Sequence, residues 1–266
     1  MNDERYFSGR SLWGNDFDEQ QRAAWFKDEQ DAYVELYASN PEYEYEYEAV
    51  NIINGFRFLP PGRQFKKALG LGSAYGDEMR PIAEKILSAV VVESSDHYEP
   101  KSDASFPLEW RKAMPSGDLP LQDSEVDLTV CLGVLHHIPN VSHVIDEIGR
   151  VTEAGGYALI REPIVSMGDW RQFRPGLTPR ERGIPRGLLM EWVKSAGFEI
   201  VKERLCFFPG TKLIARGLRR DSFRDPAMVH LDAALSRLTQ VNYRYHPRAL
   251  WQKARPTSSF LTLRRC

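Results

Sequence analysis

Two adjacent histidines and a distant glutamate are the side chains best placed for acid–base chemistry in this 266-residue chain. His136 and His137 follow the apolar run 126–132, and Glu162 follows the apolar run 157–161. Histidine exchanges a proton near neutral pH, and a carboxylate can act as a base in the same role. We therefore take His136, His137 and Glu162 as candidate general bases. Simple packing or hydrogen bonding of the two histidines within their turn is the competing interpretation.

A glycine-rich turn could hold the anionic part of a ligand. Gly70, Gly72, Ala74 and Gly76 lie where an apolar run gives way to a predicted helix, so the backbone can approach a ligand closely. The next apolar run ends in Glu93, whose carboxylate could accept hydrogen bonds from two ribose hydroxyls. This spacing suits a nicotinamide dinucleotide as well as S-adenosylmethionine, and the turn could also be purely structural.

Short apolar runs alternate with helical patterns from Phe65 onward, which is typical of a parallel sheet covered on both faces. We predict strands at 67–71, 89–93, 126–132, 157–161, 198–205 and 259–263. We predict one helix at 141–152, with Gly155-Gly156 as its stop signal, and another that starts at Pro185 and stops at Gly197. The segment 207–256 then forms an insertion, helical around 227–238.

The first 60 residues are predicted to form a helical cap. Residues 17–38 favour a helix whose aromatic side includes Trp25 and Phe26. A second helix is expected from Asn40 and Pro41 through the alternating acids and tyrosines of 42–48 to residue 54, although the alternation alone suggests a strand. We expect residues 1–60 to be a lid and residues 61–266 to form one domain.

A longer segment carries a resemblance to a known family. Residues 119–139 read Leu-Pro-Leu-Gln-Asp-Ser-Glu-Val-Asp-Leu-Thr-Val-Cys-Leu-Gly-Val-Leu-His-His-Ile-Pro. This resembles the stretch of class I S-adenosylmethionine-dependent methyltransferases that reads L-P-F-x-D-x-S-F-D-L-V and then V-L-H-H, and residues 153–156 match their K-P-G-G turn. The resemblance spans about 66–163 and extends loosely to 205. It implies an α/β, Rossmann-like, seven-stranded and mostly parallel sheet whose last strand is antiparallel, with S-adenosylmethionine as the cofactor.

The resemblance also implies positions for the cofactor. The methionine part would lie against the glycine-rich turn, the ribose on Glu93 and the adenine beside Ser94. The other implied contacts are Met114 to Asp118 for the adenine, and Cys131 and Leu132 for the methionyl group. Two acids usual in the family are missing, at Gly70 and Pro115, and Asp77 or Asp118 would have to substitute for them.

Composition excludes several other classes. The N-terminus lacks an apolar core of signal-peptide length, and no uncharged apolar stretch is long enough to span a membrane. We therefore expect a cytoplasmic protein without integral membrane association. Cys131, Cys206 and Cys266 lack the spacing of metal ligands, which predicts free thiols and no metal site. A pI near 6.3 and the absence of a base-methylation motif argue against a nucleic-acid substrate. The sequence leaves the oligomeric state open.

A loop rich in arginine suggests the acceptor. Residues 171–186 contain five arginines, and Trp170 and Phe173 offer faces for a sugar ring. We expect O-methylation of a small-molecule or glycan acceptor, anionic or carried on phosphate, such as a polysaccharide or glycolipid precursor. Alternatively, these arginines pair with residues 1–160, which hold 14 basic against 28 acidic residues. A non-catalytic methyltransferase-like scaffold and a nicotinamide oxidoreductase are the other functions considered.

Overall fold

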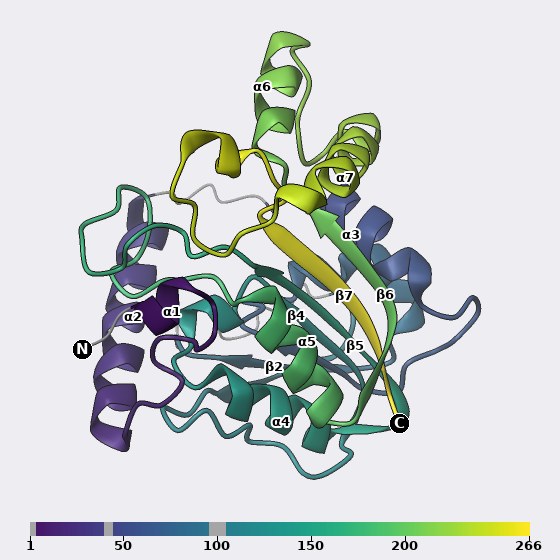
Figure 1. Cartoon of the computed structure of the whole chain (residues 1–266). Helices are drawn as coiled ribbons and strands as arrows, with labels where there is room; N and C mark the ends of the chain where they lie inside the picture. The colour runs from purple at the N-terminus through teal and green to yellow at the C-terminus, as the bar shows by residue number, and fades with distance from the viewer. Residues whose placement is uncertain (1–3, 40–44, 96–104) are drawn as a thin grey trace.

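The computed structural model describes residues 4–39, 45–95 and 105–266 (Figure 1). Its centre is a seven-stranded sheet in the order β3-β2-β1-β4-β5-β7-β6. The strands are β1 (Ala68–Leu71), β2 (Ala89–Glu93), β3 (Leu108–Lys112), β4 (Val126–Leu132), β5 (Thr152–Pro163), β6 (Phe198–Cys206) and β7 (Ser258–Arg265). All neighbours pair in parallel except β7, which is antiparallel to both β5 and β6. The predicted Rossmann-like sheet with an inserted antiparallel last strand is confirmed.

Helices precede the first strand, alternate with most of the later strands and fill the insertion between β6 and β7. The α-helices are α1 (Glu4–Phe7), α2 (Glu19–Ser39), α3 (Glu48–Asn54), α4 (Val141–Val151), α5 (Arg186–Ser195), α6 (Pro209–Gly217) and α7 (Pro226–Thr239). The 3-10 helices are η1 (Phe56–Phe58), η2 (Asp77–Lys85), η4 (Leu135–His137), η5 (Gln240–Asn242) and η6 (Leu250–Lys253). No helix in the described part of the chain is both long enough and apolar enough to span a bilayer.

Alternating side chains of the central strands build a core on each face of the sheet. On β1, Leu69 packs in the cluster formed with α4 and α5, whereas Ala68 packs in the cluster formed with η1 and η2. Figure 1 shows α4 and α5 side by side over their face. Because β1, β2 and nearly all of β4 are buried, the carboxyl ends of these strands are held in fixed positions.

Strand β3 is absent from the sequence prediction. Its five residues, Leu-Glu-Trp-Arg-Lys, are mostly charged, and the strand lies at the edge of the sheet with no fully buried position. An edge strand of this kind lacks the apolar run that reveals a central strand. The strand therefore forms through backbone pairing with β2, although its own sequence does not favour a strand.

Two of the predicted helices differ from the structure, and a third agrees with it. The segment after the glycine-rich turn is a 3-10 helix interrupted at Ile82, with Pro81 inside it, because proline cannot donate an intrahelical hydrogen bond. The helix expected from residue 40 begins only at Glu48, and residues 45–47 have no regular structure, while residues 40–44 lie outside the described part. The helix predicted at 141–152 is confirmed to within one residue, since α4 ends at Val151 and β5 starts at Thr152.

The insertion contains two α-helices rather than one. Both α6 and α7 extend beyond the strand ends (Figure 1), and a buried carboxylate joins them. Asp232 of α7 accepts hydrogen bonds from Thr211 Oγ1 (2.8 Å) and from the backbone N–H groups of Phe207 and Phe208. This contact fixes the chain at Phe207 and Phe208, just after the end of β6.

Candidate functional site

Two adjoining cavities open at the carboxyl ends of the central strands. The larger cavity has a volume of about 650 Å³ and the smaller one about 110 Å³. Gly72, Gly133 and His137 line both of them, so they meet at the ends of β1 and β4. Gly72 has a φ of +61°, and a Cβ there would lie 2.6 Å from Val134 Cγ1. The glycine is therefore required for the shape of the wall that the cavities share.

The smaller cavity gathers residues that the sequence predicted as cofactor contacts. Glu93 and Ser94 come from the end of β2, and Met114 and Asp118 come from the segment that follows β3. Helix α2 closes this cavity with Phe26. Segments far apart in the chain thus form one pocket, and the N-terminal helix is part of its wall.

Glu93 is held at the mouth of the glycine-rich turn. Its Oε2 accepts a hydrogen bond from the N–H of Ala74 at 3.2 Å, and its Oε1 accepts one from the N–H of Ser94 at 2.7 Å. Burial raises the pKa of this carboxyl, and these hydrogen bonds oppose the rise. A carboxylate oxygen can accept more than one hydrogen bond, so Glu93 retains capacity for hydroxyl donors.

The remaining predicted cofactor positions divide into two groups. Gly72, Ala74 and Leu132 line the larger cavity. Gly70, Gly76 and Cys131 are not among the described residues that line either cavity. Gly76 adopts the left-handed conformation that starts η2, and Cys131 is fully buried in the core beneath α4.

Gly70 cannot be replaced by the acid usual in the family. A Cβ at this position would lie 2.6 Å from Ser73 Oγ and 3.0 Å from Met79 Cε. Ser73 thus occupies the space that such a side chain would need. The backbone at Gly70 is correspondingly close to the turn that follows it.

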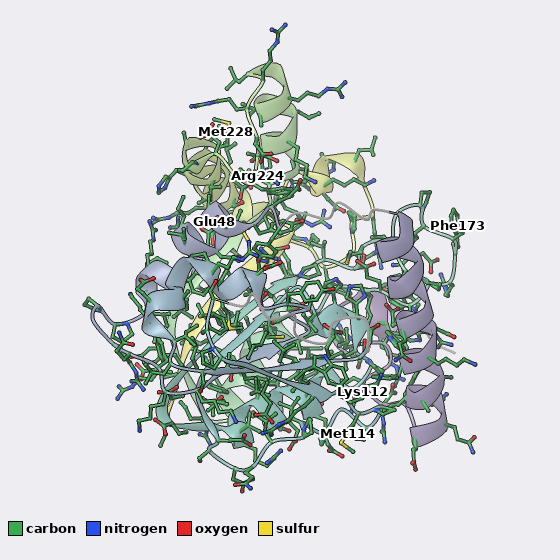
Figure 2. The ribbon with its side chains drawn as sticks, turned by 180° about the vertical axis from the view of Figure 1, so that it is seen from behind. Glu48, Lys112, Met114, Phe173, Arg224 and Met228 are labelled. Atoms are coloured by element: carbon green, nitrogen blue, oxygen red, sulfur yellow. The ribbon has the colours of Figure 1, made fainter. Side chains whose placement is uncertain are left out.

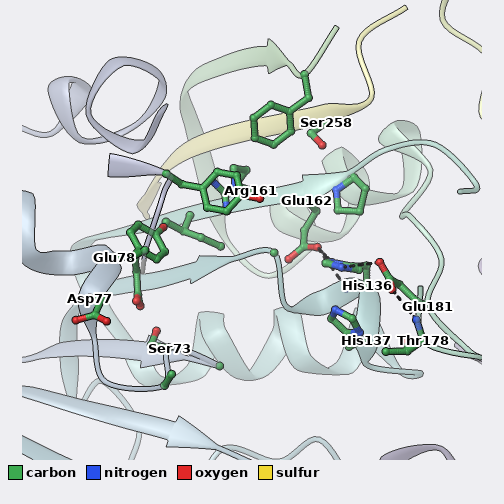
Figure 3. A pocket seen from close by; sticks show the side chains of 18 of the residues that line it. Ser73, Asp77, Glu78, His136, His137, Arg161, Glu162, Thr178, Glu181 and Ser258 are labelled. Carbon is green, nitrogen blue, oxygen red and sulfur yellow. Dashed lines mark hydrogen bonds and ion pairs between the residues drawn. The ribbon is translucent and has the colours of Figure 1, made fainter. Parts of the chain in front are cut away.

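Glu78 is a buried acid that the sequence prediction missed. It lines the larger cavity beside Ser73, and its Oε1 has no hydrogen-bond partner among the described residues (Figure 3). Burial raises its pKa to about 7, against a smaller opposing effect of the Ser73 hydroxyl. The predicted substitutes are engaged elsewhere, since Asp77 pairs with Arg80 and Asp118 with His143. The only sequence signal for Glu78 was its place two residues after Gly76.

The two histidines form a cluster with Glu162 and Glu181 at one end of the larger cavity (Figure 3), and Glu29 joins it through His137. His136 Nδ1 lies 2.7 Å from Glu162 Oε2, and His136 Nε2 lies 3.5 Å from Glu181 Oε1. His137 Nδ1 lies 2.9 Å from Glu29 Oε2. The structure therefore brings the three predicted base candidates together and adds Glu29 from α2 and Glu181 from the loop after β5.

Glu162 holds the turn that carries the histidines. Its side chain is fully buried, and it accepts hydrogen bonds from the backbone N–H groups of Val134, Leu135 and His136 as well as contacting the His136 ring. Because these donors already occupy both of its oxygens, Glu162 is better suited to positioning the turn than to accepting a proton from the acceptor. Glu162 fixes the ring of His136 relative to the cavity.

His136 carries more positive charge than an ordinary histidine. Burial lowers its pKa, but the hydrogen bonds and charges of Glu162 and Glu181 outweigh that effect and raise the pKa to about 9. The described cluster thus favours a cationic species at this point. A protonated imidazole has no lone pair with which to accept a proton, so His136 alone does not meet the requirement for a general base.

Glu29, Thr178 and Glu181 complete the cluster and were missed in the sequence. Thr178 Oγ1 donates to Glu29 Oε1 at 2.9 Å, and its N–H donates to Glu181 Oε2 at 3.1 Å. The ligand atoms of His136, His137 and Glu181 all lie within 4.8 Å of one another. Local spacing could not reveal this arrangement, because the partners lie far from the histidines in the chain.

The arginine-rich loop is held by its own surroundings. Three of its arginines form ion pairs with carboxylates: Arg171 with Asp169, Arg180 with Asp28 and Arg186 with Glu203. The other two donate to backbone carbonyls. Arg174 donates to those of Met167, Thr178 and Pro179, and Arg182 donates to four. None of the five is among the described residues that line the two cavities. Pairing with the acidic N-terminal part occurs at Arg180, and the loop reaches the larger cavity through Met167, Thr178 and Glu181 instead.

Trp170 does not present a free face to a sugar, so that expectation is wrong. Its ring is buried and stacks on Phe7 at 4.5 Å and on Trp13 at 5.4 Å between centroids. The aromatic residues before α2 thus cover this side chain. Phe173, by contrast, is 89% exposed and projects from the surface (Figure 2).

Arg161 is the one arginine or lysine among the described residues that line the larger cavity. It comes from β5, is 7% exposed, and donates to Asn51 Oδ1 at 3.1 Å. Its guanidinium lies over the rings of Tyr47 (4.5 Å) and Phe207 (5.6 Å). Within the described part of the chain, no carboxylate forms an ion pair with Arg161. Glu162, the next residue, points to the histidines at the opposite side of the cavity (Figure 3).

The sheet order and the position of the cavities define the class I methyltransferase fold. Three solved structures with this fold are similar to the chain. An S-adenosylmethionine-dependent methyltransferase from Mesorhizobium loti has a TM-score of 0.52 and 15% identity, covering 79% of this chain and 94% of that one. A protein assigned as a methyltransferase from Bacillus halodurans has a TM-score of 0.51 and 13% identity, and the match covers 82% of this chain and 98% of that one. A protein assigned as a sarcosine dimethylglycine methyltransferase from Galdieria sulphuraria has a TM-score of 0.50 and 17% identity, and the match covers 76% of this chain and 78% of that one.

A sequence match over part of the chain agrees with the fold. Residues 69–160 match the family model described as a methyltransferase domain, and no curated protein sequence matches the chain. The chain therefore carries a class I methyltransferase domain, whose cofactor is S-adenosylmethionine. The matched residues include the glycine-rich turn, Glu93 and both histidines.

Arg182 should be essential for stability. Replacing it with methionine removes hydrogen bonds to the carbonyls of Trp13, His136, Ile138 and Pro139, all at 2.9 Å. The carbonyls of His136 and Pro139 keep a backbone donor, whereas those of Trp13 and Ile138 lose the guanidinium as their donor. We expect the free energy of unfolding to fall by about 3–5 kcal/mol, measured by urea denaturation. The same change at the exposed Arg216 is the control, and equal small effects at both positions would contradict this assignment.

Proposed function

We propose that the chain transfers a methyl group from S-adenosylmethionine to an oxygen of a small-molecule or glycan acceptor bound in the larger cavity. The observation that carries the proposal is the junction of the two cavities at Gly72, Gly133 and His137. A cofactor that lies in the smaller cavity and along the glycine-rich turn would present its methyl group to the larger one. The histidine–glutamate cluster lies on that side.

The cofactor contacts follow from the lining of the cavities. Glu93 would accept hydrogen bonds from the ribose hydroxyls, while Ser94, Met114 and Asp118 would surround the adenine. Gly72, Ala74 and Leu132 would contact the methionyl part. The lid role of residues 1–60 belongs to the same proposal, since Phe26 and Glu29 of α2 line the smaller cavity and would exclude water from it.

Replacing Glu93 with alanine should weaken cofactor binding by about 2–4 kcal/mol, because two charge-assisted hydrogen bonds to the ribose are lost. Isothermal titration calorimetry with S-adenosylhomocysteine measures this change directly. Glu84→Ala, at an exposed glutamate, is the matched control. Unchanged affinity in Glu93→Ala would remove Glu93 from the ribose site.

Glu78 would take the place of the acid missing at Gly70. The methionyl part of the cofactor carries an ammonium group, and a buried carboxylate with an unpartnered oxygen beside the glycine-rich turn is suited to bind it. The raised pKa of Glu78 supports this role, because it reports a buried acid that lacks a cationic partner. Ser73 stands between Gly70 and Glu78 and connects the two positions.

Cofactor affinity should therefore depend on pH through Glu78. The pKa of this carboxyl is about 7, so it is mostly ionised at pH 8 and mostly protonated at pH 6. A protonated carboxyl cannot pair with the ammonium group, and we expect affinity to fall by roughly tenfold from pH 8 to pH 6. Calorimetry across this range should give a flatter profile for Glu78→Gln, with weaker binding at pH 8. A Gln variant that keeps the full pH dependence would rule Glu78 out.

The transfer itself needs alignment and loss of a proton. The sulfonium already activates the methyl group, so the protein must place the acceptor oxygen in line behind it and exclude water. The acceptor hydroxyl must also lose its proton as the new bond forms. The cluster of His136, His137 and Glu181 faces the cavity where this step would occur, and Glu162 fixes its geometry.

The acceptor would be anionic, and Arg161 would bind its charge. This buried guanidinium has a neutral hydrogen-bond partner and two aromatic neighbours, an arrangement that leaves its charge available to a carboxylate or phosphate. Tyr47 and Phe207 also line the larger cavity and could pack against a ring of the acceptor. A polysaccharide or glycolipid precursor is the acceptor class that these features favour.

Replacing Arg161 with methionine should raise KM for an anionic acceptor by roughly 10- to 100-fold, since a charge-assisted contact is worth about 1.5–3 kcal/mol. Binding of S-adenosylhomocysteine should stay within about twofold of the wild-type value. The acceptor class is identified by measuring the release of S-adenosylhomocysteine in the presence of sugar acids, sugar phosphates or matched neutral sugars. Arg171→Met, in the loop outside the cavity, is the control. Equal preference for neutral and charged acceptors in the wild-type protein would contradict the proposal.

A further inference from the structure

The spacing within the histidine–glutamate cluster is unusual for hydrogen bonding. His136 Nε2 and Glu181 Oε1 are 3.5 Å apart, at the outer limit of a hydrogen bond, although both groups are buried and neighbouring contacts are short. Two ligands that each lie about 2.1 Å from one ion are separated by roughly 3.0–3.4 Å at tetrahedral or octahedral angles. The separation is thus close to that of two ligands of a shared ion. One ring nitrogen of each histidine and one carboxylate oxygen of Glu181 all lie within 4.8 Å of one another.

Each of the three groups is also held from behind. Glu162 contacts His136 Nδ1 at 2.7 Å, and Glu29 contacts His137 Nδ1 at 2.9 Å. Carboxylates in this position orient a metal-binding imidazole and raise its basicity. Glu181 is fixed through its other oxygen by the N–H of Thr178. The two histidines and Glu181 could therefore act as metal ligands whose orientation is fixed by hydrogen bonds with neighbouring groups, as metal sites require.

The charges of the cluster favour a cation as well. Glu29, Glu162 and Glu181 are each less than 10% exposed. The nearby guanidinium of Arg182 donates to backbone carbonyls, and Arg174 does the same, rather than pairing with these acids. Among the described residues, the ion-pair partners of these buried carboxylates are the two imidazoles and not an arginine or a lysine, so a bound ion would add to their stabilisation.

We propose that His136, His137 and Glu181 bind one divalent transition-metal ion, which in turn binds the oxygen of the acceptor. This inference rests on the proposed function for the role of the ion, whereas the site itself rests on the geometry. Two imidazoles and one carboxylate favour ions such as Zn²⁺, Mn²⁺ or Fe²⁺ over Mg²⁺ and Ca²⁺, which prefer oxygen ligands. Three protein ligands leave positions open toward the larger cavity.

The ion would assist the transfer without any redox change. Bound to the ion, the acceptor hydroxyl has a lower pKa and releases its proton to water. The oxygen then forms a bond with the methyl carbon while the carbon–sulfur bond breaks, and the electron pair of that bond stays on sulfur. The products are the methylated acceptor and S-adenosylhomocysteine, with one proton released.

Calorimetric titration with ZnCl₂ and with MnCl₂ tests the site in the absence of any acceptor. The protein is tag-free and treated with chelator, and it carries Cys266→Ser because the thiol of Cys266 is exposed. We expect one equivalent of at least one metal to bind, with at least 100-fold weaker binding in His137→Ala and Glu181→Gln. Glu29→Gln, which alters only the outer support, should weaken binding by about 10- to 100-fold. His143→Ala, at an exposed histidine that pairs with Asp118, is the matched control.

The outcomes separate the metal site from the proposed function. Absence of binding, or equal binding by wild type and Glu181→Gln, overturns the metal site. Retained binding of S-adenosylhomocysteine by each variant establishes that the domain is folded, so loss of metal in a folded variant supports the site. Methyl transfer that persists in full after chelation overturns the role of the ion and leaves the proposed transfer intact. Metal binding without transfer to any acceptor supports the site and counts against the proposed function.

Discussion

The buried guanidinium of Arg182 is the interaction on which the arrangement of the site depends. Its donors reach the carbonyl of Trp13 at one side and those of His136, Ile138 and Pro139 at the other. The N-terminal segment, the turn after β4 and the loop after β5 therefore meet at a single side chain. Burial lowers the pKa of Arg182 to about 10, which still leaves it charged at neutral pH. A lysine could not satisfy all these acceptors, because it lacks the planar fork of donors.

The sheet was predictable because its central strands are buried on both faces and read as apolar runs. The elements that the sequence did not reveal are those whose order comes from elsewhere. Strand β3 is charged and exposed and is ordered by pairing with β2. The 3-10 segment η2 follows from Pro81 and from the left-handed start at Gly76, which a helix-period pattern does not register.

The candidate site was predictable only in part, for a related reason. His136, His137 and Glu162 lie directly after strands, so the fold itself brings them to one edge of the sheet. Their other partners approach across long separations in sequence, as Glu29 does from α2 to reach His137. The arginine-rich loop misled the prediction, since composition alone cannot distinguish an arginine that binds a ligand from one that holds a loop. Arg161 was overlooked because it reads as the last residue of an apolar strand.

The charges around the two cavities have a consistent division. Carboxylates lie along the path proposed for the cofactor, with Glu93 at the smaller cavity and Glu78 beside the glycine-rich turn. S-adenosylmethionine is cationic at both its sulfonium and its ammonium group, so this environment favours the methyl donor. Arg161 supplies the opposite charge farther along the larger cavity, where an anionic acceptor would lie. Since transfer removes the positive charge from sulfur, the product loses part of the attraction that held the substrate, and the same carboxylates that favour binding of the donor then favour its exchange.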